Sequence, residues 1–96
     1  MKKRLEEIYT LLSDENRWTR GKYARNKEGV GVPPESEEAV CWCLTGAIER
    51  IGQTPNERTQ LFIQLSVPLT GITNLQYFND NCTHQELLQL IKEVIE

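Results

Sequence analysis

The sequence contains few of the residues that build disulfide frameworks, membrane spans or catalytic centres. Its 96 residues include three cysteines and one histidine. An odd number of cysteines without an export signal argues against a disulfide framework and favours a reducing compartment, so we expect a cytoplasmic protein. The basic residues after Met1 are not followed by the apolar stretch of a signal peptide, and no apolar run approaches the roughly 18 residues that span a bilayer.

What remains is the composition of an ordinary globular domain. Apolar residues make up 39% and charged residues 26% of the chain, which excludes a disordered protein, and the length corresponds to one domain over residues 1–96. The net charge is -3, but residues 1–27 hold eight basic and four acidic side chains, whereas residues 28–96 hold three basic and ten acidic ones. The acidic overall balance argues against a domain that binds duplex nucleic acid.

Two segments have the apolar spacing of amphipathic helices. Residues 3–13 repeat apolar side chains at the intervals i, i+3, i+4 and i+7. A second helix is predicted from Ser36, a suitable N-cap, to the residue before Gly52. Its apolar stripe consists of Val40, Cys43, Leu44, Ala47, Ile48 and Ile51.

Two further helices are predicted from their first residues. Thr54–Glu57 and Thr83–Glu86 both have the sequence of a capping box, and Pro68 ends the first of these helices. Ile72–Asp80 is short and mixed and predicts a single turn or a loop. Residues 17–35 have no helical period and predict an irregular loop or a small β-hairpin. The fold class is therefore mainly α, a compact bundle of about four helices with this loop packed across it.

The cysteines raise the question of a metal site. Cys41 and Cys43, together with Cys82 and His84, would offer zinc four ligands of suitable type. On a helix, however, residues two positions apart point about 200° away from each other. We therefore expect no metal and no cofactor, and Cys43 is predicted to be a small core residue.

Two residues of the predicted second helix indicate contact with another element. Gly46, in the middle of the helix, costs about 1 kcal/mol relative to alanine, which indicates close approach of a segment such as the Trp18 loop or Phe78. The alternative is that the glycine is merely tolerated at this position. Trp42 lies on the flank of the apolar stripe. There it would cover the core, stack beneath the Trp18 loop, or face a partner.

Three motifs, in this order, resemble one family. The chain carries Trp18-Thr19-Arg20-Gly21 and then a Trp-Cys-x-x-Gly-Ala segment over residues 42–47. It ends with Asn79-Asp80 and a Thr-His-x-Glu segment over residues 83–86. This resembles the bacterial and phage domain of unknown function 6197, whose members carry W-T-[KR]-G, W-C-x-x-G-A and W-N-D…T-H-x-E. Phe78 stands where that family usually has tryptophan. The family has no assigned activity, so the resemblance implies relatives and not a function.

The first candidate site is the basic segment that contains Trp18, Arg20, Tyr23 and Arg25. Guanidinium groups bind phosphate in a bidentate manner, and aromatic rings stack on bases, so this is the chemistry of a nucleotide or nucleic-acid contact. The alternative is a solvated loop whose arginines pair with acidic residues of the same molecule.

The second candidate site consists of Asn79, Asp80 and His84. Asp80 would orient the imidazole of His84 for general base catalysis. The alternative is that Asn79 and Asp80 form a turn and that His84 belongs only to the helix cap. A lone histidine without an identified nucleophile does not make a catalytic constellation.

These observations leave three hypotheses. The first is a small non-enzymatic binding or regulatory module that recognises a protein partner or a small phosphorylated ligand through the loop from Trp18 to Arg25. In this hypothesis Asn79, Asp80 and His84 would add polar contacts to the ligand. The second is a small enzyme that uses His84 and Asp80 on a nucleotide-like substrate. The third is a structural homodimer with an interface at Trp42 or the last helix.

Overall fold

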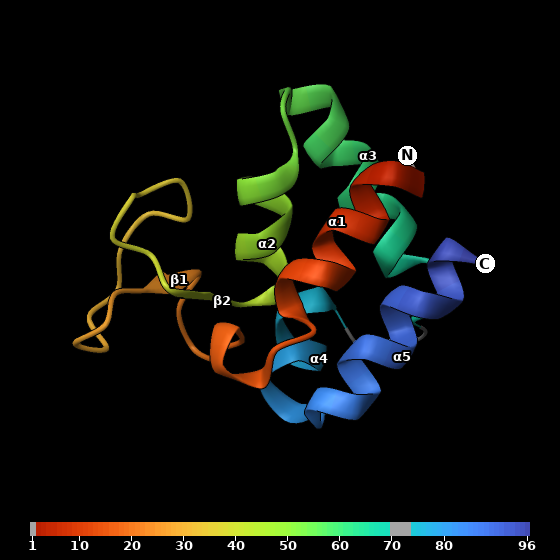
Figure 1. The fold of residues 1–96 in the computed structure, drawn as a ribbon. Helices are drawn as coiled ribbons and strands as arrows, with labels where there is room; N and C mark the ends of the chain where they lie inside the picture. Colours follow the sequence, from red (N-terminus) through yellow and green to blue (C-terminus); the bar gives the residue numbers. More distant parts are fainter. Residues whose placement is uncertain (1, 70–73) are drawn as a thin grey trace.

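A computed structural model describes residues 2–69 and 74–96 of the chain, and these residues contain five α-helices and one pair of short strands (Figure 1). The helices are α1 (Lys2–Leu12), α2 (Leu44–Ile51), α3 (Pro55–Ser66), α4 (Leu75–Asn81) and α5 (His84–Ile95). A 3-10 helix, η1 (Glu15–Arg17), follows α1, and the strands are β1 (Ala24–Arg25) and β2 (Cys41–Trp42). The mainly α fold with a small hairpin is thus confirmed. No helix in the described ranges is long and apolar enough to cross a membrane.

Helix α1 lies at the centre of the packing. Its spacing of apolar residues buries Leu5, Ile8 and Leu12, and it packs most extensively against α5 and α2. Figure 1 shows α1 running beside α5 and in front of α3. The fully buried side chains of the other helices complete one core: Leu44, Ala47, Leu61, Leu65, Leu75, Leu87 and Ile91.

The predicted start of the second helix at Ser36 is wrong, because α2 begins only at Leu44. The preceding residues Cys41 and Trp42 form β2, and Cys43 becomes the N-cap, with its sulfur accepting a hydrogen bond from the Gly46 N–H at 3.2 Å. The indole N–H of Trp42, which is buried, donates to the Pro34 carbonyl at 2.9 Å. Strand pairing and burial of the indole therefore outweigh the helical periodicity of this segment.

The exposure of Val40 follows from the same change. Val40 was counted in the apolar stripe of the predicted helix, but its side chain is 45% exposed. Its backbone N–H donates to the Arg25 carbonyl at 2.9 Å, which extends the pairing of β2 with β1. A residue that follows the strand period cannot also lie on a helical stripe.

The hairpin is more extended than the sequence suggested. Ala24 pairs with Trp42 and Arg25 with Cys41 in antiparallel register. On its other side β1 meets Gly31, which forms a bridge with Arg25, and Val32, whose N–H donates to the Ala24 carbonyl at 3.0 Å. The prediction of a hairpin within residues 17–35 therefore captured one neighbour of β1 and missed β2.

Helix α4 corrects a second prediction. The segment Ile72–Asp80 was expected to be a single turn or a loop; positions 72 and 73 lie outside the described residues, and the remainder belongs to α4. Asn74 caps this helix by accepting the Tyr77 N–H at 2.8 Å, and Leu75 and Asn79, four residues apart, face the core. The helix has only seven residues, and one of its two buried positions is polar, so it has no recognisable apolar stripe.

The two predicted capping boxes differ in the structure. At α5 the box is complete, since Thr83 Oγ1 accepts the Glu86 N–H at 3.1 Å and Glu86 accepts the Thr83 N–H at 2.8 Å. At α3 only the threonine half forms, with Thr54 Oγ1 accepting the Glu57 N–H at 3.1 Å. This confirms both helix starts but only one full box.

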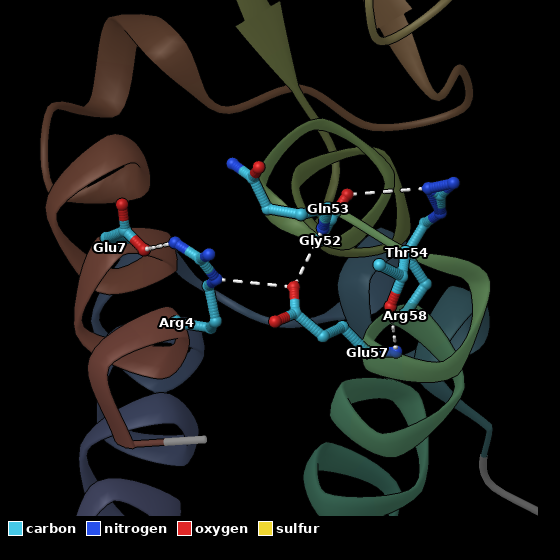
Figure 2. A network of polar contacts seen from close by, with 7 residues as sticks. All are labelled: Arg4, Glu7, Gly52, Gln53, Thr54, Glu57 and Arg58. Atoms are coloured by element: carbon cyan, nitrogen blue, oxygen red, sulfur yellow. Dashed lines mark hydrogen bonds and ion pairs between the residues drawn. The ribbon is translucent and has the colours of Figure 1, made fainter.

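The carboxylate of Glu57 instead joins α1 to the turn before α3 (Figure 2). It accepts the Gln53 N–H at 2.8 Å and the Arg4 Nε at 3.3 Å, and Arg4 also pairs with Glu7 at 2.8 Å. The hydrogen bond from Gln53, together with the charge of Arg4, lowers the pKa of Glu57. The competing donor explains why the second half of the box is absent.

Candidate functional site

The two candidate segments meet in the structure. The indole Nε1–H of Trp18 donates to Asn79 Oδ1 at 2.8 Å, and Asn79 Nδ2 donates to the Thr19 carbonyl at 3.1 Å. Asn79 is fully buried, although it is a polar residue. The loop around Trp18 and the end of α4 are therefore joined by a pair of direct hydrogen bonds.

Asn79 also connects this joint to α2. Its Oδ1 accepts a second hydrogen bond from the N–H of Leu44, the first residue of α2, at 2.9 Å. Its Nδ2 donates a second hydrogen bond to Asp80 Oδ1 at 3.1 Å. Both donor hydrogens and both acceptor positions of the amide are thus in use, which leaves this side chain no capacity to bind a ligand.

Asp80, the residue after Asn79, binds the loop at Gly21. Its carboxylate accepts the Gly21 N–H at 3.1 Å and the side-chain amide of Gln76 at 3.1 and 3.2 Å. Gly21 has φ of +82°, a conformation that glycine adopts readily. Partial burial raises the pKa of Asp80, but hydrogen bonds from Asn79, Gln76 and Gly21 and the charge of Arg20 outweigh it and lower the pKa overall.

His84 is occupied elsewhere. Its Nε2 lies 2.7 Å from the Leu12 carbonyl, and because a carbonyl can only accept, Nε2 carries the hydrogen. This bond ties the first residue of α5 to the last residue of α1. Asp80 and His84 are both described, yet no hydrogen bond joins them, so the arrangement does not form the dyad that acid–base catalysis would use.

Three side chains form a stack beside this joint. The Trp18 and His84 rings lie 5.6 Å apart, and the guanidinium carbon of Arg20 lies 4.7 Å from the Trp18 ring centroid. Arg20 Nη2 also donates to the Cys82 carbonyl. Arg20 remains exposed while it covers one face of Trp18.

Arg25 maintains the shape of the loop. Its Nε donates to Thr19 Oγ1, and its two terminal nitrogens donate to the carbonyls of Gly29 and Arg20, each at 2.9 Å. An anion at Arg25 would have to displace these bonds. Thr19 and Gln76 complete the network. The sequence offered Thr19 only as a member of the Trp18-Thr19-Arg20-Gly21 motif and did not mark Gln76 at all, because residue type does not reveal which distant group a side chain will meet.

Tyr23 connects the loop to the N-cap of α2 through its backbone. Its side chain is 56% exposed, while its carbonyl accepts the Cys43 N–H at 3.1 Å. A Cβ atom at Gly46 would lie 1.9 Å from the same carbonyl oxygen. The close approach predicted at Gly46 is thus confirmed, and the approaching segment is the Trp18 loop.

Among the residues that the structure describes, the basic side chains of the loop form no ion pairs. Residues 17–30 contain five basic side chains and one acidic side chain, Glu28. The ion pairs found among the described residues are Arg4–Glu7, Arg4–Glu57 and Arg58–Glu49, and none of them includes a cation of this segment. Arg20, Lys22 and Lys27 are all exposed. The expectation that the loop arginines pair with acidic residues of the same molecule is therefore not met in the described part of the chain.

Comparison with known proteins assigns the chain to one family. The model of a family of unknown function, DUF6197, matches residues 2–96. The chain belongs to this family. No curated protein and no solved structure matched the chain.

The cysteines and Trp42, the other residues that the sequence raised as candidates, are placed by the structure as follows. Cys43 is fully buried, and its burial raises the pKa of the thiol. Within residues 2–69 and 74–96, no three side chains of the metal-binding types gather as they would around a metal ion. Trp42 is 5% exposed, and its ring is covered by Arg50 at 5.2 Å, so its surface is not available to a partner.

Two hollows among the described residues lie beside α1, and Arg17 is the one loop residue that lines either of them. One, of about 480 Å³, has Lys3, Thr10, Arg17 and Ile51 among its lining residues. The other, of about 500 Å³, lies where Tyr9 of α1 faces Ile95 of α5. His84 lines neither hollow, so neither has the histidine at its floor that an acid–base site would require.

Proposed function

We propose that this protein is a non-enzymatic binding module whose loop from Arg17 to Val30 contacts an acidic surface of a protein partner. The observation that carries the proposal is the exposed positive charge of Arg20, Lys22 and Lys27, which no ion pair of the described residues neutralises. Complementary charge accelerates association and selects partners.

The loop is held in place before any partner binds. Trp18 and Gly21 are bound to Asn79 and Asp80 of α4, and Arg25 closes the loop through three hydrogen bonds. A segment that is already ordered loses little conformational entropy on association. This supports recognition by a fixed surface rather than by a segment that folds on binding.

The side chains around the cations favour a protein over a small ligand. Tyr23 and Val30, which are 56% and 58% exposed, lie in the same loop, and tyrosine is enriched at the centres of protein interfaces. Arg25, one of the two arginines that the sequence offers to hold an anionic group, donates within the loop instead. The exposed groups therefore suit an extended contact.

The test measures binding of a fluorescently labelled poly-glutamate peptide by anisotropy at low and at physiological salt. We expect Lys22→Glu to weaken binding at least tenfold and added salt to weaken binding by the wild type. Lys92→Glu makes the same charge change at an exposed site on α5 and is the matched control. It should weaken binding of the peptide much less than Lys22→Glu does.

The same variants are examined by thermal shift with ATP and with inorganic phosphate. Equal weakening by Lys22→Glu and Lys92→Glu, or no peptide binding at low salt, would contradict the proposal. A stabilisation by ATP that Lys22→Glu abolishes, without peptide binding, would instead assign the loop to a small phosphorylated ligand.

A further inference from the structure

Helix α3 exposes apolar side chains on the side directed away from the core. Leu61 and Leu65 are fully buried, and at about 100° per residue Ile63 falls on the opposite side of the helix, with Val67 about 40° from it. Ile63 is 56% exposed, Val67 72% and Phe62, on the flank, 44%. Neighbouring apolar side chains that stay exposed in this way are typical of surfaces that bind another molecule.

Phe62, Ile63 and Val67 are called the α3 face below. The residues around this face carry no net charge. Residues 59–69 contain no charged side chain. Two charged residues, Arg58 and Glu49, lie next to Phe62. They form an ion pair with each other, with Arg58 Nε 3.5 Å from Glu49 Oε2. The α3 face differs in this respect from the Trp18 loop, where exposed Tyr23 lies next to a cation on the chain.

Beside the α3 face lies a hollow of about 220 Å³. It is lined by Thr45, Ile48, Glu49, Arg58, Thr59 and Phe62, from α2 and α3. It offers room for an aliphatic side chain of an opposing surface. The face thus combines projecting apolar groups, Ile63 and Val67, with an adjacent depression.

We propose that the α3 face binds the same face of a second copy of the chain about a two-fold axis. In such an interface a surface meets itself, so any net charge on it would face a like charge. The α3 face is neutral and apolar, whereas the Trp18 loop is basic and would repel its own copy. In Figure 1, α2 lies between α3 and β1, so this interface leaves the loop that contains β1 free for its own partner.

The experiment determines mass by light scattering and sedimentation, up to a chain concentration of about 1 mM. We expect the wild type to approach twice the 11.1 kDa of one chain as concentration rises. Ile63→Glu should weaken association at least tenfold, because it places two carboxylates in the interface. Val40→Glu is the matched control: it makes the same kind of change at an apolar residue that is 45% exposed on the hairpin, and it should associate as the wild type does.

Circular dichroism verifies the fold of each variant, and Val67→Glu serves if Ile63→Glu fails to fold. A wild type that is monomeric throughout the concentration range would overturn the proposal, as would a dimer that persists in folded Ile63→Glu or is lost equally in Val40→Glu. Co-sedimentation with phosphatidylcholine vesicles tests a different occupant. A monomer that binds them through Ile63 would assign the face to a lipid surface instead.

Discussion

Helix α5 and the segment from Arg17 to Cys43 are stabilised over very different distances along the chain. The first turn of α5 is closed by Thr83 and Glu86, three residues apart. In the segment, Trp18 meets Asn79, 61 residues away, and Gly21 meets Asp80, 59 residues away. The comparison teaches that local chemistry determines where α5 begins, whereas distant side chains determine the shape of the loop.

The largest expected effect is at Gly46 of α2, which the segment from Arg17 to Cys43 approaches closely through Tyr23. Gly46→Ala improves helix propensity, but its Cβ would lie 1.9 Å from the Tyr23 carbonyl oxygen, so the loop must move. We expect a loss of at least about 3 kcal/mol in the free energy of unfolding, measured with urea. Gln60→Ala, at an exposed position of α3, should change it by less than about 0.5 kcal/mol. A stabilised Gly46→Ala variant would show that the loop does not pack here.

The next effect concerns the connection between loop and body. Asn79→Leu leaves the Trp18 indole, the Leu44 N–H and the Thr19 carbonyl without their partner, at a cost of about 2–4 kcal/mol. Hydrogen exchange should increase in the loop more than in α5. Asn81→Ala removes an exposed amide from the same helix and is the control. Equal exchange in both regions would contradict the view that Asn79 holds the loop.

A smaller effect is expected from the cap of α5. Thr83→Ala removes the acceptor for the Glu86 N–H and should cost about 1 kcal/mol. The change should be confined to the helix: exchange should increase in the first turn of α5 and not in the Trp18 loop. Thr83→Ser, which keeps the hydroxyl, should restore most of the loss. An equal loss in the serine variant would show that the hydroxyl bond is not what stabilises the start of α5.

The smallest effect depends on pH. Because the folded state lowers the pKa of Asp80, this group stabilises the fold above its unfolded pKa of about 3.9 and loses that contribution as pH falls through the folded value. Asp80→Asn should therefore show a weaker decline in stability below about pH 4 than the wild type, by less than about 1 kcal/mol. Urea titrations at pH 7 and pH 3 measure it. An identical acid-induced loss in both proteins would rule out this contribution.

The helix starts that could be predicted are those whose signal lies within a few residues. Thr54 and Thr83 accept the hydrogen bonds expected of them, and α1 begins and ends within one residue of the predicted range. Helix α4 could not be predicted, because Asn79 is a buried amide where periodicity requires an apolar residue. The start of α2 was misplaced because β2 is defined by its pairing with β1, which lies 17 residues earlier in the chain.

The candidate residues could be identified, but not their relation to one another. The sequence singled out Trp18, Arg25 and Asn79 by chemistry that suits ligands, and the structure uses much of that chemistry internally. Nothing in residue type distinguishes an arginine that binds an anion from one that closes a loop, because the donors are the same. The difference depends on which carbonyls the fold brings within reach.

By itself, the sequence determined the helical class of this protein and the starts of α3 and α5, because caps and apolar spacing act between residues that are close along the chain. Gly46 also indicated, correctly, that another segment comes near. Only the tertiary structure decided which segment that is, that Asn79 joins the loop to α2 and α4, and that Lys22 and Tyr23 remain exposed. These outcomes depend on contacts between residues far apart in sequence, whose energies are decided by packing and desolvation rather than by local composition.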